Sequence, residues 1–132
     1  MPRDVVSTPN APAAVGPYSQ AVRANGFLFT AGQVALVPGT STLVQGSIAD
    51  ETRRVLENLK AILAAGGSSL DRVVKATVYL RDMAHFAEMN AVYKEYFPSE
   101  APARSTVAVA GLPLGVSVEI DLVALVGNDS TS

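Results

Sequence analysis

The fold is decided by SIADETRRVLENLKAILAAGG, residues 47–67, and by VVKATVYL, residues 73–80, which follows it closely. In the first segment apolar residues recur at helical spacing, Ser47 offers an N-cap hydroxyl with Asp50 in the first turn, and Gly66-Gly67 is a stop signal. This pattern predicts a long helix. The second segment alternates, which predicts a strand whose apolar side is formed by Val74, Ala76, Val78 and Leu80.

The flanking sequence shows the same two periodicities. Asn25-Gly26 between extended segments predicts a β-hairpin, because both residues tolerate positive φ. Pro98 ends a second segment of helical spacing. The additional strands are predicted at residues 20–23, 27–34, 105–109 and 116–126, and the second helix at residues 85–97.

The predicted order is ββαβαββ, an α+β fold. Because strand-helix-strand units have right-handed crossovers, we expect both helices on one face of a mixed sheet. The last strand is apolar on both sides, with Val123 and Leu125 opposite Val118 and Ile120. An uncovered apolar face exceeds what soluble monomers usually tolerate, so we expect a homo-oligomer. The alternative is that scattered apolar residues simply face water.

Length and composition limit the possibilities. The 132 residues fit a single domain, residues 1–132, with residues 1–15 as an irregular arm and residues 127–132 as a flexible tail. A net charge of −2, with both signs interspersed, disfavours nucleic acid and anionic membranes as partners. The absence of cysteine and the single histidine argue against thiol chemistry and a metal site. Without signal-peptide features or a long apolar run, we expect a cytoplasmic protein.

Arg104 is the one cation between Phe97 and Asp121, a segment of mostly small and apolar residues. A guanidinium in such a setting needs an anion, ideally in bidentate geometry. The anion could be Glu100, Glu119 or Asp121 in an internal ion pair, or it could be the carboxylate or phosphate of a ligand. Glu119 and Asp121 share one side of the last strand, where a carboxylate can form an interfacial salt bridge or hold a water molecule as a base.

The remaining candidates carry weaker signals. Tyr18 lies in a Gly-Pro loop, where it could bind a ligand or simply pack against the protein. Asn90 lies in the second helix, where it could bind a ligand or satisfy backbone groups. The loop between Gly111 and Gly115 lacks the glycine pattern of a phosphate-binding or dinucleotide loop. We therefore expect no nucleotide cofactor.

Six motifs in order give a resemblance that spans nearly the whole chain. They are GPYSQ at residues 16–20, FTAGQ at 29–33, NLKAIL at 58–63, VKATVYL at 74–80, MNAVY at 89–93 and PARST at 102–106. Together they closely resemble the RidA family, also called the YjgF family. The resemblance implies a chorismate-mutase-like homotrimer with clefts between subunits, which hydrolyses reactive 2-enamine and 2-imine acids to 2-keto acids and ammonia without a cofactor.

The resemblance also implies roles for particular residues. Arg104 would hold the substrate carboxylate and Glu119 would orient the attacking water. The family often has Ser where this chain has Ala31, which removes a pocket hydroxyl and bears on substrate preference. The other cleft-lining positions would be Tyr18, Gly32, Asn90, Ser105 and Thr106.

Two other functions remain open at this point. One is a catabolic deaminase for a larger enamine of the aminomuconate or aminoacrylate type, for which Ala31 would fit a reshaped pocket. The other is a non-catalytic, ligand-binding or holdase-like trimer. The ribonuclease activity reported for some relatives is disfavoured by the acidic charge balance, because RNA binding normally uses a basic surface.

Overall fold

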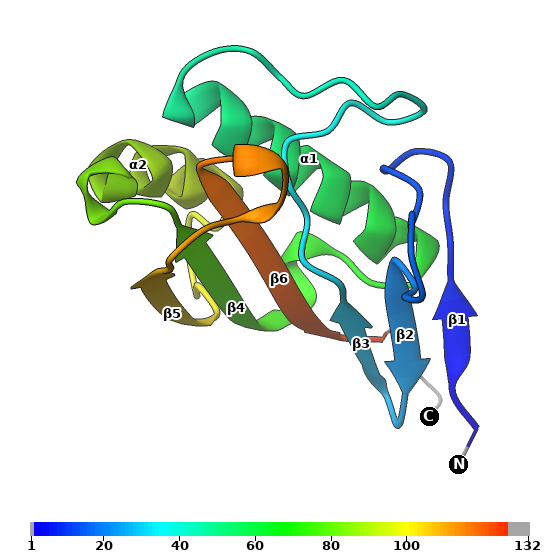
Figure 1. Cartoon of the computed structure of the whole chain (residues 1–132). Helices are drawn as coiled ribbons and strands as arrows, with labels where there is room; N and C mark the ends of the chain where they lie inside the picture. The colour runs from blue at the N-terminus through cyan, green and yellow to red at the C-terminus, as the bar shows by residue number, and fades with distance from the viewer. Residues whose placement is uncertain (1, 127–132) are drawn as a thin grey trace.

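The computed structural model describes residues 2–126 and contains, in that range, a six-stranded mixed sheet in the order β1-β2-β3-β6-β4-β5 (Figure 1). The β4–β5 pair is parallel, and the other neighbouring pairs are antiparallel. The flexible tail expected at residues 127–132 lies outside the described residues. The strands are β1 Asp4–Val6, β2 Ala21–Ala24, β3 Phe27–Thr30, β4 Val73–Leu80, β5 Ala103–Ala108 and β6 Val118–Leu125, and the α-helices are α1 Ile48–Ala65 and α2 Phe86–Tyr96.

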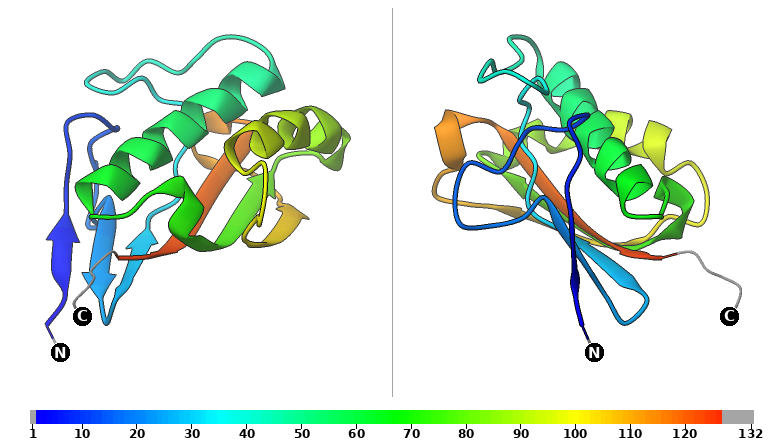
Figure 2. Two further views of the ribbon diagram at one scale, coloured as in Figure 1. Left: turned by 180° about the vertical axis from the view of Figure 1, so that it is seen from behind. Right: turned by 90° about the vertical axis from the view of Figure 1, so that its right-hand side faces the viewer.

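Both helices cover the same face of the sheet, and the opposite face is left bare (Figure 2). The mixed sheet and the one-sided placement of the helices confirm the predicted architecture. We call the bare side the open face. Within residues 2–126, no helix combines the length and the hydropathy that a bilayer crossing requires.

The N-terminal arm differs from the prediction, because residues 4–6 form strand β1. β1 pairs antiparallel with β2, with Val5 opposite Val22, so the order of elements is βββαβαββ. A strand of three residues is too short to show an alternating pattern. It forms because pairing with β2 satisfies backbone groups that would otherwise remain unpaired along that edge.

The core lies between the helices and the sheet. Helix α1 begins at the predicted cap: the Ser47 hydroxyl accepts from the Asp50 N–H at 3.1 Å, and the Asp50 carboxylate accepts from the Ser47 N–H at 3.3 Å. Each large apolar side chain buried here contributes about 1.5–3 kcal/mol. The fully buried side chains include Val55, Leu56, Leu59, Ile62 and Leu63 of α1 and Val78, Leu80, Ile120 and Leu122 of the sheet.

Strand β4 contains an irregularity that reverses one predicted side chain. The register with β6 shifts between Val73 and Lys75, so Val73 is buried and Val74 is exposed. The prediction that Val74 faces inward is therefore wrong. A β-bulge places one extra residue against the partner strand, and this offsets the alternation locally.

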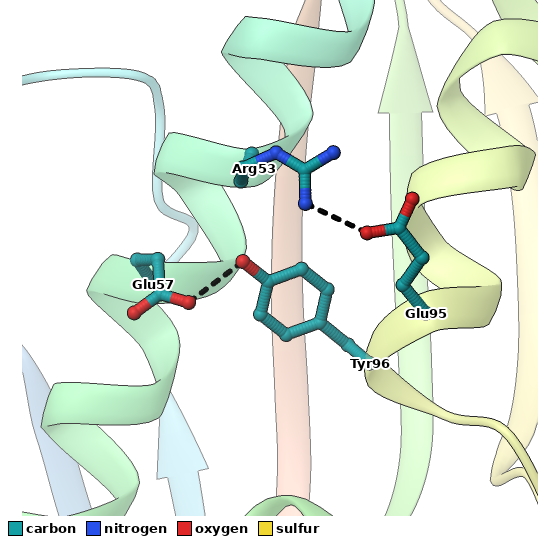
Figure 3. A network of polar contacts seen from close by, with 4 residues as sticks. All are labelled: Arg53, Glu57, Glu95 and Tyr96. Atoms are coloured by element: carbon teal, nitrogen blue, oxygen red, sulfur yellow. Dashed lines mark hydrogen bonds and ion pairs between the residues drawn. The ribbon is translucent and has the colours of Figure 1, made fainter.

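Two polar contacts join the outer surfaces of α1 and α2 (Figure 3). Arg53 Nη1 lies 2.7 Å from Glu95 Oε1, and the Tyr96 hydroxyl donates to Glu57 Oε2 at 2.7 Å. Burial, reinforced by the hydrogen bond to Glu57, raises the pKa of Tyr96 to about 12, so the phenol stays a donor at neutral pH. The Arg53–Glu95 pair is exposed to solvent, which screens it, so it adds little to the stability of the fold. The contacts therefore orient α2 more than they stabilise the domain.

The side chain of Gln20 fastens the N-terminal arm to the sheet. It is almost fully buried; its Oε1 accepts from the Thr8 N–H at 2.7 Å, and its Nε2 donates to the carbonyls of Thr8 at 3.1 Å and Pro12 at 2.7 Å. The carbonyls can be satisfied only by a donor. A carboxylate has nearly the same size as the amide but has no N–H to donate. The position therefore requires an amide.

Replacing Gln20 with glutamate is expected to lower the free energy of unfolding by about 2–4 kcal/mol, because a buried carboxylate would face carbonyls that need donors. Urea unfolding at neutral pH measures the change. The same substitution at the exposed Gln45 is the matched control. Equal stability of the two variants would show that the buried amide has no such role.

Candidate active site

Strand β5 directs Arg104 toward the helix-covered face of the sheet. Arg104 lies opposite Ala76 of β4, whose side chain is buried beneath the helices, and residues opposite each other in a sheet point to the same face. The guanidinium carbon lies 4.6 Å from the ring centre of Tyr93 and 5.5 Å from that of Phe86. Cation–π contacts of this kind hold the guanidinium in place against α2.

Asn90 fixes the direction of the guanidinium. Arg104 Nη1 donates to Asn90 Oδ1 at 2.7 Å. Because the amide oxygen is engaged, the Asn90 nitrogen remains a donor for another group. Phe86, Asn90 and Tyr93 occupy positions i, i+4 and i+7 of α2 and so share one face of the helix. This spacing is the signal in the sequence that could have identified Phe86 and Tyr93 as supports of Arg104.

Arg104 has no acidic partner within the described residues. The ion pairs found in residues 2–126 are Arg23–Asp4 and Arg53–Glu95. The internal ion pair that the sequence allowed for Arg104, with Glu100, Glu119 or Asp121, is therefore not formed in the described part of the chain. Asn90 is neutral, so the charge of Arg104 is uncompensated, and its other N–H groups are available to an anion.

A surface groove opens beside Arg104. Its volume is about 370 Å³, within the usual range for small-molecule sites of roughly 300–1,000 Å³. A larger groove of about 620 Å³, between the C-terminal ends of α1 and α2, is not lined by Arg104. We call the smaller one the Arg104 groove; its lining residues are Asn90, Tyr93, Lys94, Phe97, Ala101, Pro102 and Arg104.

Glu119 forms a second cluster, on the open face. It lies on β6 opposite Tyr79, and its neighbours along the strand, Val118 and Ile120, are buried beneath the helices. Gly32 packs directly against it: a Cβ at Gly32 would lie 2.8 Å from Glu119 Cδ. The Glu119 carboxylate therefore rests on bare backbone, a contact that sequence reasoning did not foresee.

The environment of Glu119 favours its protonated form. Burial raises the pKa of Glu119 above its ordinary value of 4.5, and the neighbouring charge of Asp121 adds to the effect. Asp121 itself accepts a hydrogen bond from the Tyr79 hydroxyl at 3.1 Å. Among the side chains of residues 2–126, none hydrogen-bonds to the Glu119 carboxylate, so its oxygens are available to water or a ligand.

The raised pKa of Glu119 predicts how the stability of the fold depends on pH. The folded protein binds a proton at Glu119 more tightly than the unfolded chain does, so the charged carboxylate destabilises the fold above the ordinary pKa. Replacing Glu119 with glutamine is expected to raise Tm at pH 7, and the gain should vanish as the pH falls below about 4. Calorimetry at both pH values measures this, with the exposed Glu100→Gln as control. A Tm that is unchanged at pH 7 would contradict it.

The predicted site residues divide between the two faces. Thr106 lies opposite Val78 and shares the covered side with Arg104. Its Oγ1 is buried and has no hydrogen-bond partner within residues 2–126. Ser105 faces the open side and accepts from Lys75 Nζ at 3.1 Å. Ala31, next to Gly32, donates its N–H to the carbonyl of Gln20.

Tyr18 belongs to neither cluster within one chain. Its side chain is 52% exposed and lines a third groove, formed with the N-terminal arm. Its hydroxyl lies 3.4 Å from the Val15 nitrogen. Within residues 2–126, acidic and imidazole side chains do not gather in the groups of three that a metal site would need.

Arg104 and Glu119 therefore face opposite sides of the sheet, on strands that are separated by β4. Neighbouring strands are about 4.8 Å apart, and the backbone of the sheet lies between the two side chains. A small molecule bound to Arg104 cannot reach Glu119 of the same chain. A site that uses both residues must take them from two copies of the chain.

Known proteins share both the sequence and the fold. A family model described as endoribonuclease L-PSP matches residues 8–126. A RutC family protein of Pyrococcus horikoshii is 54% identical, over 92% of this chain and 97% of its own. The mouse 2-iminobutanoate/2-iminopropanoate deaminase is 46% identical, over 95% of this chain and 93% of its own.

The crystal structure of RidA from an Antarctic Psychrobacter superposes with a TM-score of 0.89 at 41% identity, over 93% of this chain and 99% of that one. Both this agreement and the sequence matches extend over almost all of the described residues. The motifs that suggested the resemblance all lie inside the matched region. The chain belongs to the RidA family.

Proposed function

We propose that the protein hydrolyses 2-imino and 2-enamine acids to 2-keto acids and ammonia, at sites that combine Arg104 of one copy with Glu119 of another. The observation that carries the proposal is the state of Arg104: it is held between two aromatic rings and an amide, it has no acidic partner within residues 2–126, and it lines an open groove. The deaminase name of the mouse relative supports it.

Arg104 acts as the clamp for the substrate carboxylate. Its free N–H groups bind the two carboxylate oxygens, which places the imine carbon one bond away in a defined position. Asn90 and the two rings keep the guanidinium from turning. Because the carboxylate is present in substrate and transition state alike, the main contribution of Arg104 is to place the carbon next to the attacking water.

Glu119 of the neighbouring copy holds that water. As the water oxygen bonds to the imine carbon, Glu119 accepts one proton from the water and passes it to the imine nitrogen, which gives a tetrahedral carbinolamine. Glu119 then accepts the hydroxyl proton of the carbinolamine and passes it to the nitrogen as the carbon–nitrogen bond breaks. Ammonia leaves, the carbonyl of the keto acid forms, and Glu119 is again a carboxylate. The raised pKa of Glu119 makes its carboxylate a stronger base, and general base catalysis of this kind contributes roughly 10²–10⁴-fold.

The open face is the surface through which copies would associate. Phe29 is 46% exposed there, and Val107 and Leu125 are each 43% exposed. All three lie on the same side of the sheet as Glu119. Contact between different surfaces of identical chains closes into a ring when the rotation permits. We propose a homotrimer, and light scattering should give three times the chain mass of 13.7 kDa. A stable monomer that retains activity would exclude the two-copy site.

A coupled assay tests the activity. A threonine dehydratase releases 2-aminocrotonate, which tautomerises to 2-iminobutanoate, and the appearance of 2-oxobutanoate is followed with and without the protein. We expect faster keto-acid formation with the protein. An unchanged rate would contradict the deaminase proposal, and binding of 2-keto acids without turnover would favour a ligand-binding trimer instead. With a net charge of −2, we expect no RNA cleavage by the same preparation.

A further inference from the structure

The Arg104 groove has an unusual charge composition. Two of its lining residues, Lys94 and Arg104, are cations, and none of its lining residues is acidic. The nearest acid in sequence, Glu95, is engaged with Arg53 at 2.7 Å. Glu100 lines the larger neighbouring groove and not this one. Within residues 2–126, Lys94 forms no ion pair, so both positive charges of the groove are uncompensated.

The other groups of the groove complete a site for a dianion. Asn90 lies one helical turn before Lys94, and its amide nitrogen is a free donor because the oxygen accepts from Arg104. Phe97, Ala101 and Pro102 supply apolar lining to the same groove. A ligand with an acid at each end and methylene groups between them matches this combination.

We propose that the site prefers 2-imino acids that carry a second carboxylate, with Arg104 holding the carboxylate next to the imine and Lys94 attracting the side-chain carboxylate. This inference rests on the proposed deaminase function and adds a substrate class to it. The reaction is unchanged: water adds to the imine carbon, ammonia leaves, and the product is a 2-keto dicarboxylic acid. Lys94 acts on selectivity and not on the chemical step.

The size of the preference follows from the exposure of Lys94. A lysine at the surface interacts with a carboxylate through water and salt, so its effect is modest, about fivefold in kcat/KM. The effect should also weaken with ionic strength, since the Debye length falls from about 10 Å at 0.1 M salt to about 3 Å at 1 M.

The test compares two imines with five-carbon chains, 2-iminoglutarate and 2-iminopentanoate. Each is generated from glutamate or norvaline by a flavin amino-acid oxidase with catalase present, and its decay is followed by trapping with semicarbazide. We expect kcat/KM to be about fivefold higher for the dicarboxylate. Lys94→Gln should remove this advantage, Lys94→Arg should keep it, and added salt should reduce it. Lys60→Gln, on α1 outside the Arg104 groove, is the control that should keep both rates.

The outcomes separate this inference from the proposed function. Failure to accelerate either imine would overturn the deaminase function itself. Hydrolysis of 2-iminopentanoate without an advantage for 2-iminoglutarate would overturn only the preference. A Lys94→Gln variant that slows both imines equally would also overturn it, because Lys94 would then act on a step that the two substrates share.

Discussion

Replacing Arg104 with alanine is expected to lower kcat/KM for 2-iminobutanoate by roughly 10²–10⁴-fold, because the substrate loses two charge-assisted hydrogen bonds of about 1.5–3 kcal/mol each. The fold should tolerate the change. Arg104 is only half-buried, and the rings of Phe86 and Tyr93 can still pack against α2 and its neighbours. The coupled dehydratase assay measures the rate, and light scattering measures the assembly.

Two further variants make this result specific. Arg104→Lys keeps the charge but loses the fork, so it should recover only part of the activity. Arg72→Ala removes an exposed arginine outside the Arg104 groove and should keep the wild-type rate. If Arg104→Ala turned over 2-iminobutanoate as fast as the wild type, the substrate carboxylate would have to be held elsewhere.

Replacing Gly32 with alanine is expected to lower kcat by roughly 10–100-fold with little loss of stability. The new Cβ would overlap the Glu119 carboxylate, which can move because it is the far end of a flexible side chain. Stability therefore changes little. The carboxylate would leave the position from which it orients water, and a misplacement of about 1 Å in a catalytic group can cost 10²-fold.

Gly111→Ala is the matched control, because a Cβ at Gly111 meets no heavy atom of the described residues within 4 Å. Steady-state kinetics and urea unfolding on both variants separate catalysis from folding. A Gly32→Ala variant with full activity would show that the position of Glu119 over Gly32 does not matter. A variant that unfolds much more easily would show that Gly32 serves the fold instead.

Local features of the fold could be predicted from the sequence because each is encoded by neighbouring residues. The cap at Ser47 and Asp50 formed as expected. The hairpin also formed at Asn25 and Gly26, whose φ angles are 51° and 82°. The strand β1 and the bulge at Val74 were missed, because both depend on pairing with a distant strand and leave no periodic pattern nearby.

The placement of the candidate site was harder to predict than its members. Arg104 was expected just before a strand at residues 105–109, whereas β5 begins at Ala103 and includes it. Most residues of this edge strand are exposed, so its sequence shows no regular alternation of apolar and polar residues. The side of the sheet to which Arg104 points could therefore not be predicted from the sequence. The contact of Gly32 with Glu119 likewise arises only when residues 31–33 are brought beside β6 by the bridge between Gln33 and Ile120.

The most direct test of the two-copy site is a mixed oligomer. Arg104→Ala and Glu119→Gln chains are purified separately, unfolded in urea, and refolded either alone or in equal amounts together. Each variant alone should be nearly inactive. In the mixture, a site at which an intact Arg104 meets an intact Glu119 of the neighbouring copy forms with a probability of about one quarter, so about a quarter of the wild-type activity should return. Activity in the mixture no higher than that of the separate variants would contradict the two-copy site.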